Sequence, residues 1–376
     1  MYRLVQRRGI IGLFCLLFVA SSVVPGWAQK DNRFEVSKNL DIFNSLLKEV
    51  EMFYVDSVDV DKTVQRGIEA MLAGLDPYTE YYPEQKTEEL SLMTTGEYGG
   101  IGSLIRQRNN EGGVMIAEPT EGMPADLAGL KPGDLILAID TIDVSKATNS
   151  RVSELLKGVP NTKMVLTIQR PGEKKPRKFE ITRKQITTPQ VTYYGVKNDS
   201  IGYIYLKAFT IKSAQEVKEA FLDLKKNHNI KSLVLDLRGN GGGVLEGAVQ
   251  IVGMFVPKGS EVLSTKGKIK QWDRTYRTST EPLDTVMPLA ILINGGTASA
   301  AEIVSGSLQD MDRAVLVGQR SFGKGLVQAP HDLPYNGKVK ITMSKYYIPS
   351  GRCIQQIDYS HRKEDGSVAA ICLLYT

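Results

Sequence analysis

The sequence predicts a protein of several domains in the α/β (α+β, multidomain) class. From Val191 onward, short apolar runs alternate with stretches that carry apolar residues at helical spacing, which is typical of an α/β sheet. Upstream, residues 37–75 have the pattern of two amphipathic helices, and residues 91–172 combine short strands with glycine-rich turns. A chain of 376 residues is long enough for two or three such domains.

Residues 1–28 are predicted to form a cleaved signal peptide. Arginines at positions 3, 7 and 8 precede an apolar run over residues 10–24, which is short for a membrane span. Small residues at 26 and 28 suit a cleavage site. We therefore expect export, to the periplasm, with membrane association as the alternative if the segment is retained.

Composition excludes several classes of function. Loss of the three signal-peptide arginines would lower the formal charge of +5 by three, so the basic balance does not predict binding to nucleic acid or lipid. Beyond the signal peptide, the cysteines are Cys353 and Cys372, and no cysteine or histidine cluster has metal-ligand spacing. We expect no disulfide framework, no metal and no organic cofactor.

Residues 29–90 are predicted to form an N-terminal helical segment. Ser37 is the predicted N-cap of its first helix, whose apolar stripe consists of Leu40, Phe43, Leu46, Leu47 and Val50. A second helix is expected near residues 61–75, with Val64, Ile68, Met71 and Leu72 on its apolar face. Such stripes indicate core or a homodimer surface more often than a site.

Residues 91–172 contain two glycine-containing stretches, each followed by a predicted strand. The first spans residues 98–102 and leads into a predicted strand at 103–106; the second spans 124–134 and leads into a strand at 135–139. With a helix at 149–157 and a closing strand at 164–170, the segment resembles a PDZ domain.

That resemblance implies a peptide-binding groove. Backbone N–H groups of the loop would bind a terminal carboxylate, and strand 103–106 would pair with the peptide. The groove helix would hold the last apolar side chain with Val152 and Leu155. The implied loop residues are Tyr98, Gly99, Gly100, Ile101 and Gly102. A PDZ-shaped domain with a silent groove is the alternative.

Residues 173–376 are predicted to form the core domain. Strands are expected at 201–206 and 232–237, and helices at 213–227 and 245–255. Between the second strand and the second helix, three consecutive glycines would let backbone N–H groups approach a developing oxyanion. The alternative is a flexible turn; a phosphate loop is disfavoured because no Gly-Lys-Ser/Thr follows.

The stretch 289–328 carries the candidate chemistry. An apolar strand at 289–293 leads through a tight turn into a helix at 298–308, and Ser299 lies at the junction, where a hydroxyl meets the free N–H groups of a helix start. Lys324 stands between two glycines. A nucleophilic serine needs a general base, which is usually a histidine, but the histidines at 228, 331 and 361 do not lie in a glycine-rich, strand-to-helix segment. A lysine can act as the base instead if burial lowers its pKa. An ordinary N-cap and loop lysine are the alternative.

These residues resemble the signature of the carboxyl-terminal processing peptidases, or tail-specific proteases. The match runs from Asn294 to Ile303 and continues in Gly323-Lys324-Gly325-x-x-Gln328, with Thr297 in place of the usual first serine. The resemblance implies a crotonase-like ββα core into which the PDZ domain is inserted. It also covers the Asp-Pro-Tyr-Thr sequence at 76–79, which closes the helical segment in this family.

By resemblance, Ser299 is the nucleophile, Lys324 its general base and Gln328 the residue that positions the lysine. One oxyanion donor would be the N–H of Gly242 or Gly243 and the other that of Ala300. Glu302, one helical turn after the serine, is interpreted as a structural or hydrogen-bonding residue.

The sequence thus predicts an exported serine endopeptidase that acts on the C-termini of unfolded or tagged proteins, with an adaptor protein left open as a further partner. The rival hypothesis is a non-catalytic PDZ adaptor or chaperone on a protease-like fold. Acyl-CoA chemistry on the crotonase-like core is disfavoured by the PDZ domain and the export signal. After Val368 the likeness fades, so a truncated C-terminal end of the core is also left open.

Overall fold

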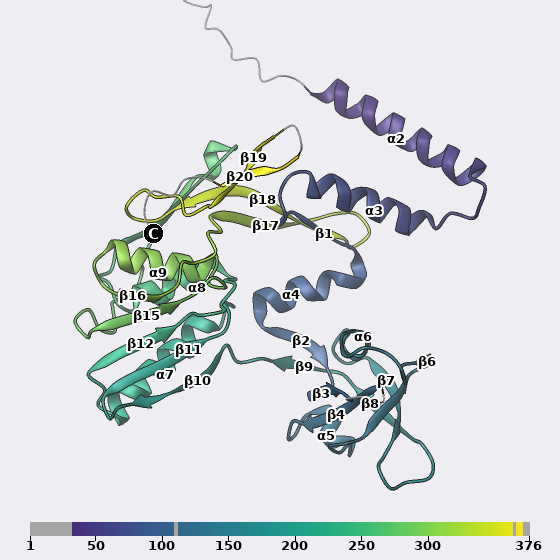
Figure 1. The fold of residues 1–376 in the computed structure, drawn as a ribbon, viewed down its shortest axis with the longest axis horizontal. Coiled ribbons are helices and arrows are strands. Elements are labelled where there is room, and N and C mark those ends of the chain that lie inside the picture. The colour runs from purple at the N-terminus through teal and green to yellow at the C-terminus, as the bar shows by residue number, and fades with distance from the viewer. Residues whose placement is uncertain (1–31, 109–111, 364–365, 371–376) are drawn as a thin grey trace, which may run out of the picture. The chain divides into compact units, whose positions relative to one another are not determined.

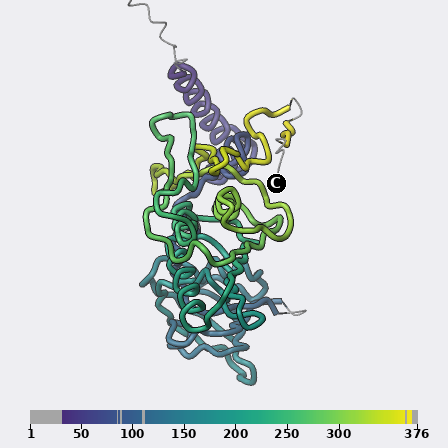
Figure 2. The backbone as a smooth tube through the Cα atoms, turned by 90° about the vertical axis from the view of Figure 1, so that its left-hand side faces the viewer, coloured from purple at the N-terminus to yellow at the C-terminus, as the bar shows by residue number. Residues whose placement is uncertain are grey.

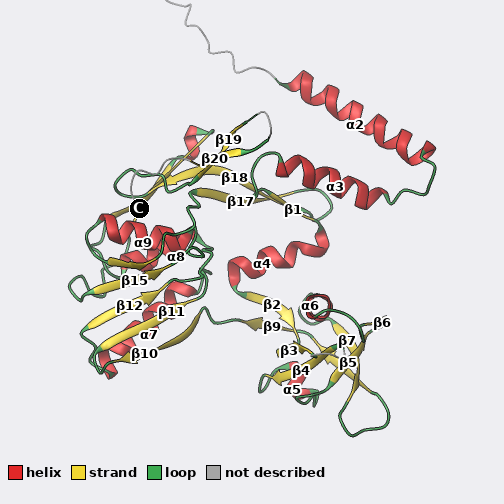
Figure 3. Ribbon diagram, viewed as in Figure 1, coloured by secondary structure: helices red, strands yellow, loops and turns green. Residues whose placement is uncertain are grey.

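A computed structural model describes residues 32–108, 112–363 and 366–370, so the predicted signal peptide lies outside the described residues. The chain divides into two compact units, residues 1–67 and 68–376. Figure 1 labels the helices and strands, Figure 3 colours them by type, and Figure 2 traces the same path as a tube.

The described residues of the first unit, 32–67, form helices and their connections. Helix α2 (Arg33–Phe53) buries none of its residues, and helix α3 (Val60–Ala73) runs across the boundary between the units. The prediction that Ser37 caps the first helix is wrong: the N-cap is Asn32, five residues earlier, because Glu35 suits the positive end of a helix dipole and nothing in residues 33–36 breaks a helix. No helix in the described ranges is long and apolar enough to cross a membrane.

The second unit contains a sheet with the predicted PDZ strands. Its order is β3 (Ser103–Gln107), β4 (Val114–Pro119), β5 (Leu135–Ile139), β7 (Lys163–Gln169) and β8 (Arg177–Thr182), and β6 (Ile142–Asp143) pairs with β5. Helices α5 (Pro124–Leu127) and α6 (Asn149–Leu156) complete this part, which has its own apolar core. Strand β3 is an edge strand, so one of its backbone edges is free of sheet partners within the described residues.

A second apolar core lies in the α/β part of the unit. Strands β11 (Ile201–Leu206), β12 (Ser232–Asp236), β15 (Leu289–Ile293) and β16 (Val315–Gly318) are parallel, and β10 (Val191–Lys197) adds an antiparallel edge. Helices α7 (Ser213–Asn227), α8 (Leu245–Gly253) and α9 (Ala300–Asp310) contribute to the same core. Leu233, Leu235 and Ile291 are almost fully buried, as expected for parallel strands covered by helices.

A further sheet joins segments that are far apart in the sequence. Its order is β1 (Glu80–Tyr82), β18 (Lys338–Tyr347), β13 (Glu261–Gly267) and β14 (Arg274–Arg277), and β17 (Leu326–Asp332) also pairs with β18. Strand β1 precedes the PDZ-like part in the sequence, yet it pairs with β18 in register Glu80↔Lys340. The chain before the PDZ-like part therefore supplies a strand to the core.

The remaining elements connect these sheets. Helix α4 (Thr87–Thr95) leads into β2 (Glu97–Gly100), which pairs with β9 (Lys184–Thr187) on the return to the core. Strands β19 (Ile357–Arg362) and β20 (Val368–Ala370) pair with each other, and the single-turn helices η1 (Glu84–Lys86) and η2 (Lys270–Trp272) lie in loops.

Candidate active site

Ser299 lies where β15 gives way to α9, as the apolar run and small residues predicted. Its backbone has φ 55° and ψ −118°, a left-handed conformation that a residue with a side chain adopts only at a cost of about 1–3 kcal/mol. This conformation turns the chain from strand to helix at Ser299, next to the unused N–H groups of the first turn. Among the described residues, the N–H of Ala300 at the first helical position has no acceptor.

The carboxylate of Glu302 joins the serine to the loop that carries the lysine. Its Oε2 accepts hydrogen bonds from the N–H groups of Ser299 at 2.8 Å and Lys324 at 2.9 Å. Its Oε1 accepts from the Gly323 N–H and the Ser321 hydroxyl, both at 2.7 Å. Glu302 is 3% exposed, and this burial raises its pKa. It has the hydrogen-bonding role that the sequence suggested.

Tyr346 makes a second link between the same two residues. Its buried hydroxyl donates to the carbonyl oxygens of Ser299 at 3.1 Å and of Lys324 at 2.5 Å. The N–H and the carbonyl of both residues are thus held by side chains from α9 and β18. Ser299 and Lys324, 25 positions apart in sequence, are adjacent in the fold.

The amine of Lys324 lies in a shielded position. Its Nζ is 4.3 Å from the centre of the Tyr78 ring. Burial, assisted by the positive charge of Lys340, lowers the lysine pKa to about 8. The carboxylates of Glu80, Asp76 and Glu302 act in the opposite direction without cancelling the effect of burial.

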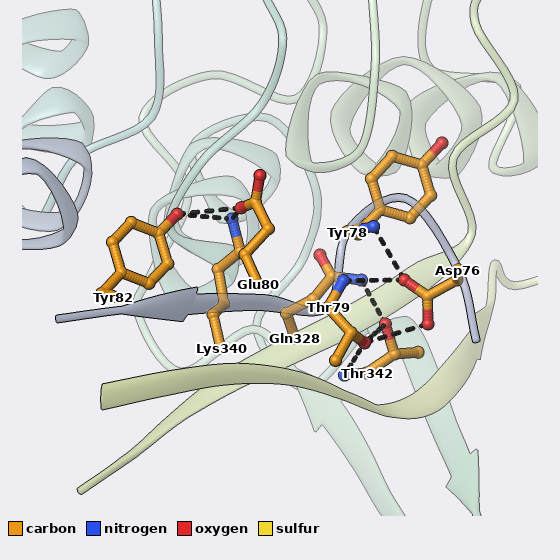
Figure 4. Close-up of polar contacts among 8 residues, drawn as sticks. All are labelled: Asp76, Tyr78, Thr79, Glu80, Tyr82, Gln328, Lys340 and Thr342. Carbon is orange, nitrogen blue, oxygen red and sulfur yellow. Dashed lines mark hydrogen bonds and ion pairs between the residues drawn. The ribbon is translucent and has the colours of Figure 1, made fainter. Parts of the chain in front are cut away.

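Gln328 lies on β17 opposite Thr342 of β18, which in turn contacts the Asp76–Thr79 turn. Its amide donates to the hydroxyl of Thr342 at 3.1 Å, and no hydrogen bond to Lys324 occurs in the described structure. Figure 4 shows how Thr342 leads on to Thr79 and Asp76. The predicted positioning residue is therefore connected to the chain segment that carries Tyr78.

The glycine loop after β12 packs directly against the serine. A methyl group at Gly242 would lie 2.7 Å from the Ser299 Cβ and 2.9 Å from the Ala300 nitrogen. The Gly242 N–H is already used, because it donates to the Asn240 side chain at 2.9 Å. In the described part of the chain, the Gly243 N–H donates to no protein group, so it is the better placed of the two candidate oxyanion donors.

The predicted peptide-binding residues of the PDZ domain lie in strand β2, in the turn that leads into β3, and on helix α6. Tyr98, Gly99 and Gly100 belong to β2 and pair with β9. Ile101 and Gly102 form the turn into β3, and their carbonyls accept from Ala125 and Thr120. Val152 is fully buried in the domain core, and Leu155 is partly buried beside it.

Sequence reasoning did not anticipate Tyr78, Thr342 or Lys340 as neighbours of the candidate lysine, whereas Tyr346 lies in a segment, 345–352, whose family resemblance implied a strand and turn behind the active site. Positions 76–79 attracted notice only as a family-like motif, and nothing in their spacing relates them to residue 324. The described residues contain no group of three or more side chains that could hold a metal ion.

Two models of protein families match this chain. The model of peptidase family S41 matches residues 200–360, and that of the PDZ domain matches 115–170. The carboxy-terminal-processing protease of Bartonella bacilliformis is 36% identical over 345 residues, which cover 91% of this chain and 77% of that protein. The chain belongs to this protease family. It is accordingly a serine-type protease with a PDZ domain.

Other relatives extend the likeness. A probable CtpA-like serine protease of Staphylococcus aureus is 32% identical over 320 residues, which cover 84% of this chain but only 62% of that protein. The solved structure of a photosystem II D1 C-terminal processing protease is 29% identical, with a TM-score of 0.46, and covers 82% of this chain and 83% of that one.

Proposed function

We propose that this family member is an exported endopeptidase that recognises the C-terminal tails of unfolded or tagged proteins and cleaves them with a Ser299–Lys324 dyad. The observation that carries the proposal is the pair of hydrogen bonds from the Ser299 and Lys324 amides to one oxygen of Glu302. A buried carboxylate that holds both backbones limits how far the hydroxyl and the amine can separate.

In the proposed reaction, the neutral Lys324 amine takes the proton of the Ser299 hydroxyl while the serine oxygen attacks the scissile carbonyl carbon. The N–H groups of Gly243 and Ala300 donate to the resulting oxyanion. The protonated amine then gives its proton to the departing amine. Water, activated by Lys324, hydrolyses the acyl-enzyme and regenerates the serine.

Gln328 acts through its contact with Thr342 rather than by a direct bond to the lysine in this structure. Selection of C-termini would fall to the PDZ part, where the free edge of β3 can add a peptide strand. Export, to the periplasm, rests on the signal-like residues 1–28.

The decisive experiment compares casein cleavage by the mature protein and by its Ser299→Ala variant. Ser299 takes part in a capping box with Glu302 at the start of α9, but loss of a capping hydroxyl costs only about 1–2 kcal/mol, so we expect a folded variant without proteolysis. The melting temperature supplies the folding control. Full cleavage by the alanine variant would overturn the dyad and leave a different nucleophile or a binding function.

A further inference from the structure

The turn Asp76–Thr79 lies outside the sequence segments that carry the dyad, but several hydrogen bonds from its own side chains hold it in place. The Asp76 carboxylate accepts from the N–H groups of Tyr78 and Thr79, both at 2.8 Å, and from the Thr79 hydroxyl at 3.0 Å. Asp76 and Thr79 are 7% and 4% exposed, which is unusual for polar residues in a turn.

The turn is fastened to the strands beside the lysine. The Thr79 hydroxyl, whose one proton goes to Asp76, accepts from the Thr342 N–H at 3.1 Å and lies 3.3 Å from the Thr342 hydroxyl. The Thr342 hydroxyl also accepts from Gln328, so one threonine connects the turn with the predicted positioning residue (Figure 4). The residue that follows the turn, Glu80, forms an ion pair with Lys340 across the β1–β18 pair.

This fixed turn places the ring of Tyr78 over the lysine amine, 4.3 Å from the ring centre. Tyr359 packs against the same ring in a T-shaped arrangement, at 6.0 Å between centroids and 88° between planes. Tyr78, Phe322, Gly323 and Tyr359 also line a cavity of about 340 Å³. The ring therefore borders both the amine and a space large enough to hold water.

We propose that Tyr78 is a positioning residue for the protease reaction: held by Asp76, Thr79 and Thr342, its ring excludes water from the Lys324 amine and so favours the neutral form of the base. This inference rests on the proposed role of Lys324 as general base. It assigns part of the active site to the chain that precedes the PDZ domain.

Two effects of the ring oppose each other. An aromatic face attracts a protonated amine, which favours the charged form of Lys324. Shielding from water favours the neutral form, and burial is the largest influence on this lysine pKa. The charged neighbours that face the amine come from four elements: Lys340 on β18, Glu80 on β1, Asp76 on the turn and Glu302 on α9. A substitution at Tyr78 leaves all four in place.

The sign of the expected change follows. If the ring is removed and water reaches the amine, the lysine pKa rises toward its usual value near 10.5. The neutral fraction at pH 7 then falls about tenfold for each unit by which the pKa rises. A Tyr78→Leu variant would still shield the amine from water but would have no aromatic face to attract its charged form, so it separates the two effects.

The test measures kcat/KM for casein cleavage from pH 6 to 10 in Tyr78→Ala, Tyr78→Leu and Tyr78→Phe. We expect the midpoint of the alanine variant to move at least about one pH unit upward, with a loss of about tenfold or more at pH 7. The phenylalanine and leucine variants should stay close to the parent midpoint or move downward. Tyr81→Ala is the matched control, because this tyrosine of β1 packs beside Gly337 instead.

A second readout is independent of turnover. In the Ser299→Ala background, the rate at which acetic anhydride labels Lys324 is followed against pH by peptide mass spectrometry. Removal of the ring should raise both the labelling midpoint and the overall access of the reagent. If Tyr78→Ala does not fold, Tyr78→Val replaces it in both measurements and is judged in the same way.

An unchanged midpoint in the alanine (or valine) variant would overturn the role of Tyr78. An upward shift of the same size in Tyr81→Ala would also overturn it, because the effect would then be general. Failure of the underlying dyad is distinguishable: it would appear as residual proteolysis in Lys324→Met, whatever the Tyr78 variants do.

Discussion

The backbone N–H groups of Ser299 and Lys324 donate to the same oxygen of Glu302, at 2.8 and 2.9 Å. The shared acceptor fixes the start of α9 relative to the loop before β17. The candidate nucleophile and base are therefore positioned by their main chains, and their side chains remain available for chemistry.

Glu302→Gln should disrupt this arrangement while nearly conserving shape. Each oxygen of the Glu302 carboxylate accepts two hydrogen bonds, but a glutamine amide has only one oxygen. At least one buried N–H would then face an NH₂ group, which should lower the free energy of unfolding by about 1–3 kcal/mol. Displacement of the dyad should lower kcat by about 10²-fold. Thermal melts and casein cleavage measure both effects. Glu261→Gln, at an exposed ion pair, is the control and should change neither appreciably.

The pH dependence of proteolysis should follow Lys324. The lysine must be neutral to accept a proton, and its pKa is lowered to about 8, so activity should rise about tenfold per pH unit below 8 and level off above it. Lys324→Arg should be inactive throughout, because guanidinium stays protonated. A flat profile from pH 6 to 9, or an active arginine variant, would identify a different base.

Gly242→Ala should remove activity, whereas Gly241→Ala should not. A methyl group at Gly242 would meet the Ser299 Cβ at 2.7 Å, and the backbone there has φ +94°, which disfavours a side chain. Displaced oxyanion donors cost about 10²–10³-fold in kcat. At the neighbouring Gly241, a methyl group would have no atom within 4 Å. Equal kcat values for the two variants would contradict the proposed arrangement of the loop.

Peptide recognition should depend on a free C-terminus. The full chain carrying Ser299→Ala is titrated with one peptide that ends either in a carboxylate or in an amide. Hydrogen bonds to a charged group contribute about 1.5–3 kcal/mol, so the free carboxylate should bind at least about tenfold more tightly. Identical affinities would show that the domain does not read C-termini.

Much of the fold was predictable because its signals are local. Apolar spacing predicted α7 (Ser213–Asn227) and β11 (Ile201–Leu206) with the observed bounds, and the PDZ resemblance did so for β5 (Leu135–Ile139). The start of α2 was mispredicted, because Ser37 is a good cap type in a segment that also tolerates helix. The end of α8, at Gly253 rather than at Phe255, differs by two residues.

The sequence by itself determined which residues carry the candidate chemistry. A serine at a strand-to-helix junction, a lysine between glycines and a run of three glycines are local patterns, and the family resemblance rests on the same residues. The sequence also suggested a hydrogen-bonding role for Glu302, since the residue lies one helical turn after Ser299.

Only the tertiary structure decided what surrounds that chemistry. The pairing of β1 with β18 brings Tyr78 over Lys324, although 246 positions separate them in sequence, and a hydrogen bond from Gly242 to Asn240 favours Gly243 as the oxyanion donor. The periodicity of apolar residues indicates which face of a helix or strand is buried. It carries no information about which distant strand supplies the next edge, because that choice depends on register and packing across the whole domain.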